Sequence, residues 1–171
     1  MHNDTYIDGD STNDIETQTY KAYNYCIYLL GRRYYSVKEV KDKLRNKEYP
    51  EEISEAIISL LEEKGLLDDY RFATAWVRDR NNFKPRGKAL LARELIARGI
   101  DGKTIGRVIE EEFPDDDIEL AHRAIASKIR VYKTLDRTTG VRRARNFLIR
   151  RGFNYETVRI AVSAIFDEDS R

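Results

Sequence analysis

The sequence has a single cysteine, Cys26, only three prolines, and no apolar run longer than the six residues from Tyr25 to Leu30. One thiol excludes an internal disulfide framework and suits a reducing compartment. A run of this length is far below the roughly 20 apolar residues that cross a bilayer. The first residues also lack the basic start and apolar stretch of a secretory signal. We therefore expect a cytoplasmic protein without disulfides or a membrane segment.

Charge is unevenly distributed along a chain whose net charge is only +1. Residues 1–19 contain five acidic residues, no Lys or Arg and few large apolar residues, which predicts a disordered acidic tail. Residues 167–171 are predicted to form a second, shorter tail. Residues 20–166 hold thirty basic and twenty-two acidic residues, a net charge of +8. A basic body of this kind favours polyanionic partners such as nucleic acid or an acidic protein groove.

The apolar residues recur with a helical period, and alternation of the kind found in strands is almost absent. Ile53, Ile57 and Leu60, for example, lie on one face of a helix that Gly65 would end. The pattern predicts an all-α protein. The expected helices lie near residues 20–33, 37–47, 51–64, 69–82, 87–98, 102–112, 116–133, 138–151 and 155–166.

These helices are predicted to be three copies of one three-helix unit. Ser36, Gly87 and Gly140 occupy the same place in each copy, 51 and then 53 residues apart. The apolar positions that follow them also correspond: Val40, Leu44 and Tyr49; Leu91, Leu95 and Ile100; Ala144, Leu148 and Phe153. In the last two copies, Gly99 and Gly152 each precede an apolar residue and then an Asp or Asn, the pattern of a helix C-cap followed by an N-cap.

The repeat divides the chain into three modules, 20–67, 68–114 and 115–166. Units that stack in series contact mainly their neighbours. We therefore predict an elongated, curved molecule.

A search for catalytic chemistry finds little. Gly102-Lys103-Thr104 matches the end of a phosphate-binding loop, but Ala97 stands where that loop needs glycine, and a helix precedes it instead of a strand. His122 has no second His or Cys at ligand spacing, and Cys26 is expected to be a buried small apolar residue. Glu110–Glu112 oppose the helix dipole, which leaves an acidic metal site there as an alternative. We predict no enzymatic activity, no cofactor and no metal.

Basic residues recur on the middle helix of every module. The helix at 138–151 is the densest, and Val141, Ala144 and Leu148 would bury one face and leave Arg142 and Arg143 exposed. A solvated helix face explains one such run, whereas recurrence in stacked modules predicts one continuous basic surface. The predicted partner-binding residues are Lys38, Lys41, Arg45, Arg86, Lys88, Arg93, Arg98, Arg142, Arg143, Arg145, Arg150 and Arg151.

Aromatic residues give weaker signals. Six of the eleven tyrosines lie between residues 20 and 35, where they could pack in the core or form a flat contact surface. Phe72 and Trp76, one turn apart, are predicted core residues. The first module could also be a helix-turn-helix with its second helix in a DNA groove, but that helix begins with Glu51, Glu52 and, after two residues, Glu55.

Several stretches resemble the RecX family, the regulatory proteins of the bacterial recombinase RecA. The resemblance covers about residues 20–166. It depends on four stretches: Tyr28-Leu29-Leu30 through Arg32-Arg33; Ser36 to Val40 with Lys43-Leu44; Gly65 to Asp69 through Phe72-Ala73; and Gly87, Leu91, Glu94-Leu95 and Arg98-Gly99-Ile100.

The resemblance implies a non-enzymatic modulator, expected to be an inhibitor, that binds in the groove of the RecA–DNA filament. Such a protein would limit recombination, ATPase and co-protease activity, in the context of DNA repair and the SOS response. Two alternatives remain: a sequence-independent module for single-stranded or duplex DNA, and a helical-repeat adaptor for an acidic protein. The chain is expected to be a monomer.

Overall fold

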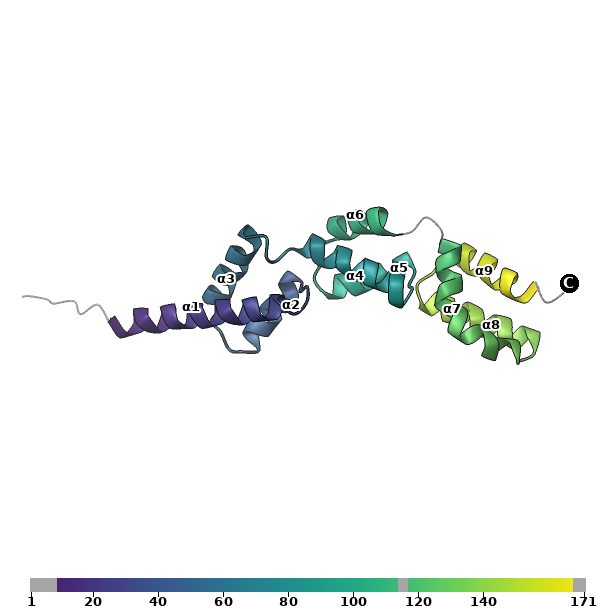
Figure 1. Cartoon of the computed structure of the whole chain (residues 1–171), viewed down its shortest axis with the longest axis horizontal. Helices are drawn as coiled ribbons and strands as arrows, with labels where there is room; N and C mark the ends of the chain where they lie inside the picture. Colours follow the sequence, from purple (N-terminus) through teal and green to yellow (C-terminus); the bar gives the residue numbers. More distant parts are fainter. Residues whose placement is uncertain (1–8, 114–116, 168–171) are drawn as a thin grey trace, which may run out of the picture. The chain divides into compact units, whose positions relative to one another are not determined.

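The structure is a computed structural model that describes residues 9–113 and 117–167, with side chains described from residue 14. These residues form nine helices and no strand, which confirms the predicted all-α class. None of these helices is long and apolar enough to cross a membrane. The helices are α1 (Gly9–Leu30), α2 (Val37–Arg45), α3 (Glu51–Glu63), α4 (Asp69–Phe83), α5 (Lys88–Ala97), α6 (Gly102–Glu112), α7 (Asp117–Lys133), α8 (Arg137–Arg150) and α9 (Tyr155–Asp167) (Figure 1).

Packing divides the chain into two units, residues 1–69 and residues 70–171. The first holds α1 to α3, and the second holds nearly all of α4 and the helices that follow it. The division of the second unit into modules 68–114 and 115–166 stays a prediction. Residues 168–171 of the predicted second tail lie outside the described part of the chain.

Helix α1 begins at Gly9, so the prediction of a disordered segment is wrong for residues 9–19, and residues 1–8 lie outside the described residues. The reason is an apolar spacing that continues past the expected start of the helix. Ile15, Thr19 and Tyr23 lie four residues apart and line a groove together with residues of α3.

The first unit packs its three helices around one apolar core. Cys26 of α1, Val40 and Leu44 of α2 and Leu61 of α3 are fully buried there. The side chain of Ser36 caps α2 by accepting a hydrogen bond from the backbone N–H of Glu39 over 3.1 Å. That bond satisfies one of the amides that a helix start leaves unpaired.

The second unit has a continuous core to which every helix from α4 to α9 contributes. The aligned apolar positions of the sequence repeat are buried in it, which confirms their assignment: Leu91, Leu95, Ile100, Ala144, Leu148 and Phe153. Phe72 is buried, as predicted, and its ring stacks on that of the half-buried Trp76 with centroids 6.0 Å apart. Gly99 and Gly152 have φ values of 84° and 85°, the left-handed conformation expected after a helix end.

Candidate interaction surface

The twelve basic residues predicted to bind a partner differ in what their side chains contact. Some are held by acidic or aromatic groups of the same protein. Others are exposed and form no ion pair with a carboxylate in the part of the chain that the structure describes. This difference decides which residues can offer charge to a partner, because a guanidinium or ammonium group already paired with a carboxylate gains little from a second anion.

On α2, acidic side chains hold Lys41 and Arg45. The ammonium of Lys41 lies 3.2 Å from a carboxylate oxygen of Glu55 and 3.4 Å from one of Glu51, both on α3. The hydrogen bonds to Glu55 and then Glu51 raise the pKa of Lys41. Arg45 pairs with Asp42 over 2.7 Å, and Lys38 is exposed. The positive charge of α2 is therefore partly neutralised by its neighbours.

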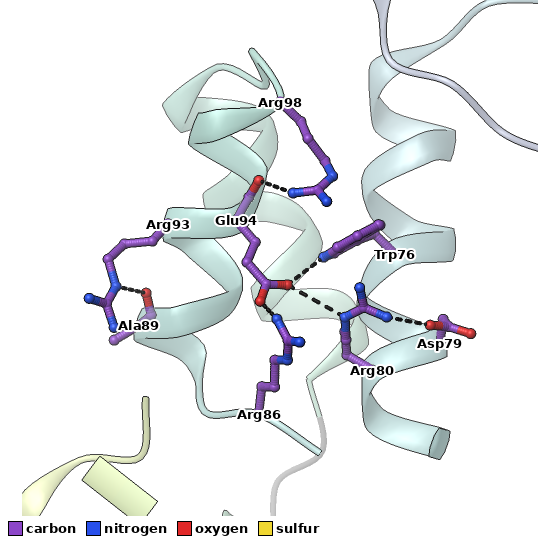
Figure 2. Close-up of polar contacts among 8 residues, drawn as sticks. All are labelled: Trp76, Asp79, Arg80, Arg86, Ala89, Arg93, Glu94 and Arg98. Atoms are coloured by element: carbon purple, nitrogen blue, oxygen red, sulfur yellow. Dashed lines mark hydrogen bonds and ion pairs between the residues drawn. The ribbon is translucent and has the colours of Figure 1, made fainter. Parts of the chain in front are cut away.

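On α5, Glu94 gathers a cluster of cations and one indole (Figure 2). The indole N–H of Trp76 donates to a Glu94 carboxylate oxygen over 2.9 Å. The guanidinium of Arg80 lies 3.5 Å from the same oxygen, and Arg86 forms an ion pair with the other one. Arg98 donates to the backbone carbonyl of Glu94 over 2.9 Å.

Two of these arginines also lie against the ring system of Trp76. The guanidinium carbons of Arg98 and Arg80 lie 3.7 Å and 3.9 Å from the centre of its ring system. Burial, followed by the nearby charge of Arg80, lowers the pKa of Arg86. Arg86 and Arg98 therefore stabilise the contact between α4 and α5, and we leave them out of the candidate surface.

The other two predicted residues of α5 remain on the surface. Lys88 lies over the ring of Phe113, 4.8 Å from its centre, and Arg93 donates to the carbonyl of Ala89 over 3.4 Å. Both are exposed. Within the described part of the chain, neither pairs with a carboxylate.

Helix α8 carries the least neutralised charge. Arg142, Arg143, Arg145 and Arg150 are exposed, and α8 contains no acidic residue. None of the four forms a hydrogen bond or ion pair with any described residue. Asp136 before α8 has a lowered pKa, caused mainly by hydrogen bonds with Thr139 and to a smaller extent by Arg142. We call these four arginines the α8 face.

The face that was predicted to be buried is buried. Ala144 and Leu148 are fully enclosed, Val141 is half-buried, and Arg151 lies half-buried over the ring of Phe147. Val141, Arg142, Arg145, Asn146 and Ile149 line a groove of about 450 Å³, and Ile149 is 49% exposed. Cationic and apolar groups therefore lie side by side on α8, an arrangement suited to an anionic partner that also offers apolar contacts.

The acidic residues at the end of α6 are used in ion pairs. Glu111 accepts from Tyr70 and pairs with Arg107 over 2.8 Å, and Tyr70 followed by Arg107 lowers the pKa of Glu111. Glu112 accepts from Arg78 over 2.7 Å. Across residues 9–113 and 117–167, no three His, Cys, Asp or Glu side chains gather as metal ligands. Sequence reasoning missed Arg78 because it lies on α4. Arg107 lies four residues before Glu111 on α6, a spacing that could have indicated this ion pair.

The remaining candidates have structural roles. The carboxylate of Asp101 accepts from the backbone N–H groups of Lys103 and Thr104, so Asp101 caps the start of α6. His122 is half-buried and lies 3.3 Å from the carbonyl oxygen of Ala161. Burial raises the pKa of the Cys26 thiol to about 11, which keeps it protonated.

These observations define a class: an all-helical protein built from repeated three-helix domains, whose candidate site is a cationic surface. Comparison with known proteins identifies the family. Residues 22–61 match the model of the first three-helix domain of RecX, and residues 68–109 match that of the second.

Two relatives, both named regulatory protein RecX, are each 33% identical to the chain. The protein from Streptomyces lividans aligns over 129 residues, 75% of this chain and 69% of its own length. The protein from Mycolicibacterium smegmatis aligns over 152 residues, 86% of this chain and 80% of its own length. The chain belongs to the RecX family, whose named relatives are regulatory proteins.

Solved structures agree with this fold. A crystal structure of regulatory protein RecX matches 94% of this chain and 80% of its own with a TM-score of 0.79 at 22% identity. RecX from Lactobacillus salivarius matches 88% and 97% with a TM-score of 0.76 at 21% identity.

Proposed function

We propose that the protein is a non-enzymatic modulator of the RecA recombinase that binds in the groove of the RecA–DNA filament and inhibits recombination, ATPase and co-protease activity. Membership of a family of regulatory proteins supports a regulatory role. The α8 face is the observation that carries the proposal of a polyanionic partner. Its four arginines are exposed and form no hydrogen bond or ion pair with the residues that the structure describes, so they can meet such a partner.

The chemistry of α8 favours a protein–DNA filament over bare DNA as the target. Phosphates alone would satisfy the arginines but not Ile149, whose side chain is 49% exposed in the groove between them. A protein surface supplies apolar contacts that persist when salt screens the charges. Lys88 and Arg93 would add charge from the same unit.

A sequence-independent DNA-binding module is the second candidate, because the residues 20–166 carry a net charge of +8. The two candidates differ in salt dependence. Binding to bare DNA through phosphate contacts alone falls steeply as salt rises, since counterions are released. An adaptor for an acidic protein remains a third possibility, and neither alternative requires RecA.

The direct test is RecA ATPase activity on single-stranded DNA, with the protein added in amounts well below one per RecA. A filament-binding inhibitor reduces the rate at these amounts. A competitor for bare DNA reduces it only when the protein is abundant enough to cover the DNA, a result that would replace the proposal by the second candidate.

A further inference from the structure

The first unit carries an apolar groove that has no part in the cationic surface described above. Ile15, Thr19, Tyr20 and Tyr23 of α1 line one side, and Ile57 and Leu60 of α3 line the other; Glu16 and Lys64 complete it. The volume is about 560 Å³. We call it the α1–α3 groove.

Large apolar side chains of this groove are left in solvent. Tyr20 is 70% exposed, Ile15 is 53% exposed and Leu60 is 37% exposed. Contiguous exposed apolar surface with a polar rim is typical of sites where another molecule docks. The core of the same unit is complete without it, because Cys26, Leu44 and Leu61 are already buried between the three helices.

The groove exists because α1 continues towards its N-terminus beyond the domain that it helps to form. The match to the first three-helix domain of RecX begins at residue 22, whereas Ile15, Thr19 and Tyr20 precede it. In Figure 1, the N-terminal part of α1, coloured dark purple, runs past α2 and α3. The α1–α3 groove thus lies between this extension of α1 and the C-terminal half of α3.

The α1–α3 groove has the shape to bind a third helix, because the residues that line it recur at helical spacing on both of its sides. Ile15, Thr19 and Tyr23 follow one face of α1, and Ile57, Leu60 and Lys64 follow one face of α3. An amphipathic helix enters such a groove with apolar residues at every third or fourth position.

The charge around the groove selects among such helices. The lining holds one acid, Glu16, and one base, Lys64. More acids surround it: Asp14 lies two residues before Glu16 on α1, and Glu62 and Glu63 end α3 just before Lys64. The part of α1 before Lys21 contains no Lys or Arg. A second copy of α1 would bring like charges together, so the acidic surroundings favour a cationic occupant.

We propose that the α1–α3 groove binds an amphipathic helix of a partner protein, with apolar residues facing the groove and basic residues on its flanks. This site is separate from the α8 face and has the opposite charge preference. The two sites share no residue.

The test uses the full-length chain and three labelled 15-residue helical peptides as probes. All share one stripe of leucines at helical spacing, and their flanking residues are all Lys, all Gln or all Glu. Fluorescence anisotropy gives the affinities. We expect the Lys peptide to bind at least tenfold more tightly than the Glu peptide, with the Gln peptide between them.

Two variants assign the binding to the groove. Leu60→Asp and Tyr20→Ser should each weaken binding of the Lys peptide, Leu60→Asp by tenfold or more. Leu66→Asp is the matched control, because Leu66 is 47% exposed, lies in the same unit and does not line the groove. Tyr20→Ser adds no charge and changes a side chain outside the core, so it separates loss of binding from loss of folding.

Two results would overturn the proposal. The Lys peptide could bind both variants as tightly as it binds the unmodified chain. Alternatively, sedimentation could show a dimer that Leu60→Asp and Tyr20→Ser dissociate and Leu66→Asp does not, which would assign the groove to a second copy of the chain.

Discussion

The backbone N–H of Gly87 donates a hydrogen bond to the carbonyl oxygen of Arg151 over 2.8 Å, which joins the start of α5 to the end of α8. The two backbone segments lie too close together here to leave room for side chains. A Cβ on Gly87 would lie 2.1 Å from the carbonyl oxygen of Gly152, and one on Gly152 would lie 2.5 Å from the Cβ of Leu90. Both glycines are therefore required by a contact between residues far apart in sequence.

This contact predicts that Gly87→Ala lowers the free energy of unfolding by about 1–3 kcal/mol, the usual cost of forcing extra atoms into a packed region. Gly106→Ala is the control, because a Cβ there meets nothing within 4 Å and alanine favours the interior of α6. Urea unfolding followed by circular dichroism measures both. Equal stability of the two variants would contradict the close approach.

The Glu94 cluster predicts a second difference in stability. Glu94→Gln removes the carboxylate that pairs with Arg86 and leaves several cations in a site where the Glu94 side chain is 14% exposed, so we expect a loss of about 3 kcal/mol. Glu55→Gln removes an exposed partner of Lys41 and should cost less than about 1 kcal/mol. Trp76 is the only tryptophan, so its fluorescence should change in Glu94→Gln alone. Similar stability losses in both variants would count against a structural role for the cluster.

The buried thiol of Cys26 makes the stability of the fold depend on pH. Burial raises its pKa from 9.0 to about 11 in the folded chain, so folding favours the neutral thiol. That contribution is complete below pH 9 and is lost as the pH rises towards 11. At pH 8, a thiol reagent should label the chain at once in denaturant and only slowly without it. Rapid labelling of the folded chain would show that Cys26 is accessible.

The sequence repeat predicts an extended particle. A compact globule of this length has a radius of gyration of about 15–16 Å. Small-angle scattering should give a clearly larger value if three modules follow one another in series. A value in the compact range would reject the serial arrangement.

The local sequence pattern predicted which side of a single helix is buried and which is exposed. The spacing of Ala144 and Leu148 fixed the buried side of α8 and hence the exposure of Arg142, Arg143 and Arg150. The same reasoning could not foresee that Arg86 and Arg98 are engaged by Glu94 and Trp76, because Trp76 comes from a different helix. Contacts of that kind are set by tertiary packing.

The first unit shows the same limit. Composition predicted disorder before residue 20, since acidic residues are frequent there. The spacing of Ile15, Thr19 and Tyr23 was the signal that could have extended the helix. That spacing alone does not show what the residues pack against; in the structure they face Ile57 and Leu60 of α3.

The measurement that tests the central proposal most directly is the affinity of the protein for RecA filaments assembled on single-stranded DNA, compared with bare single-stranded DNA, at physiological ionic strength. The α8 variant Arg142→Glu, Arg143→Glu, Arg150→Glu reverses three charges that form no ion pair with the described residues. Its control, Arg78→Glu, Arg107→Glu, Arg159→Glu, makes the same change in net charge at arginines paired with Glu112, Glu111 and Glu156. We predict tighter binding to the filament than to bare DNA, and a loss of filament binding of at least tenfold in the α8 variant only. Equal affinity for filament and bare DNA, or equal losses in both variants, would contradict the account.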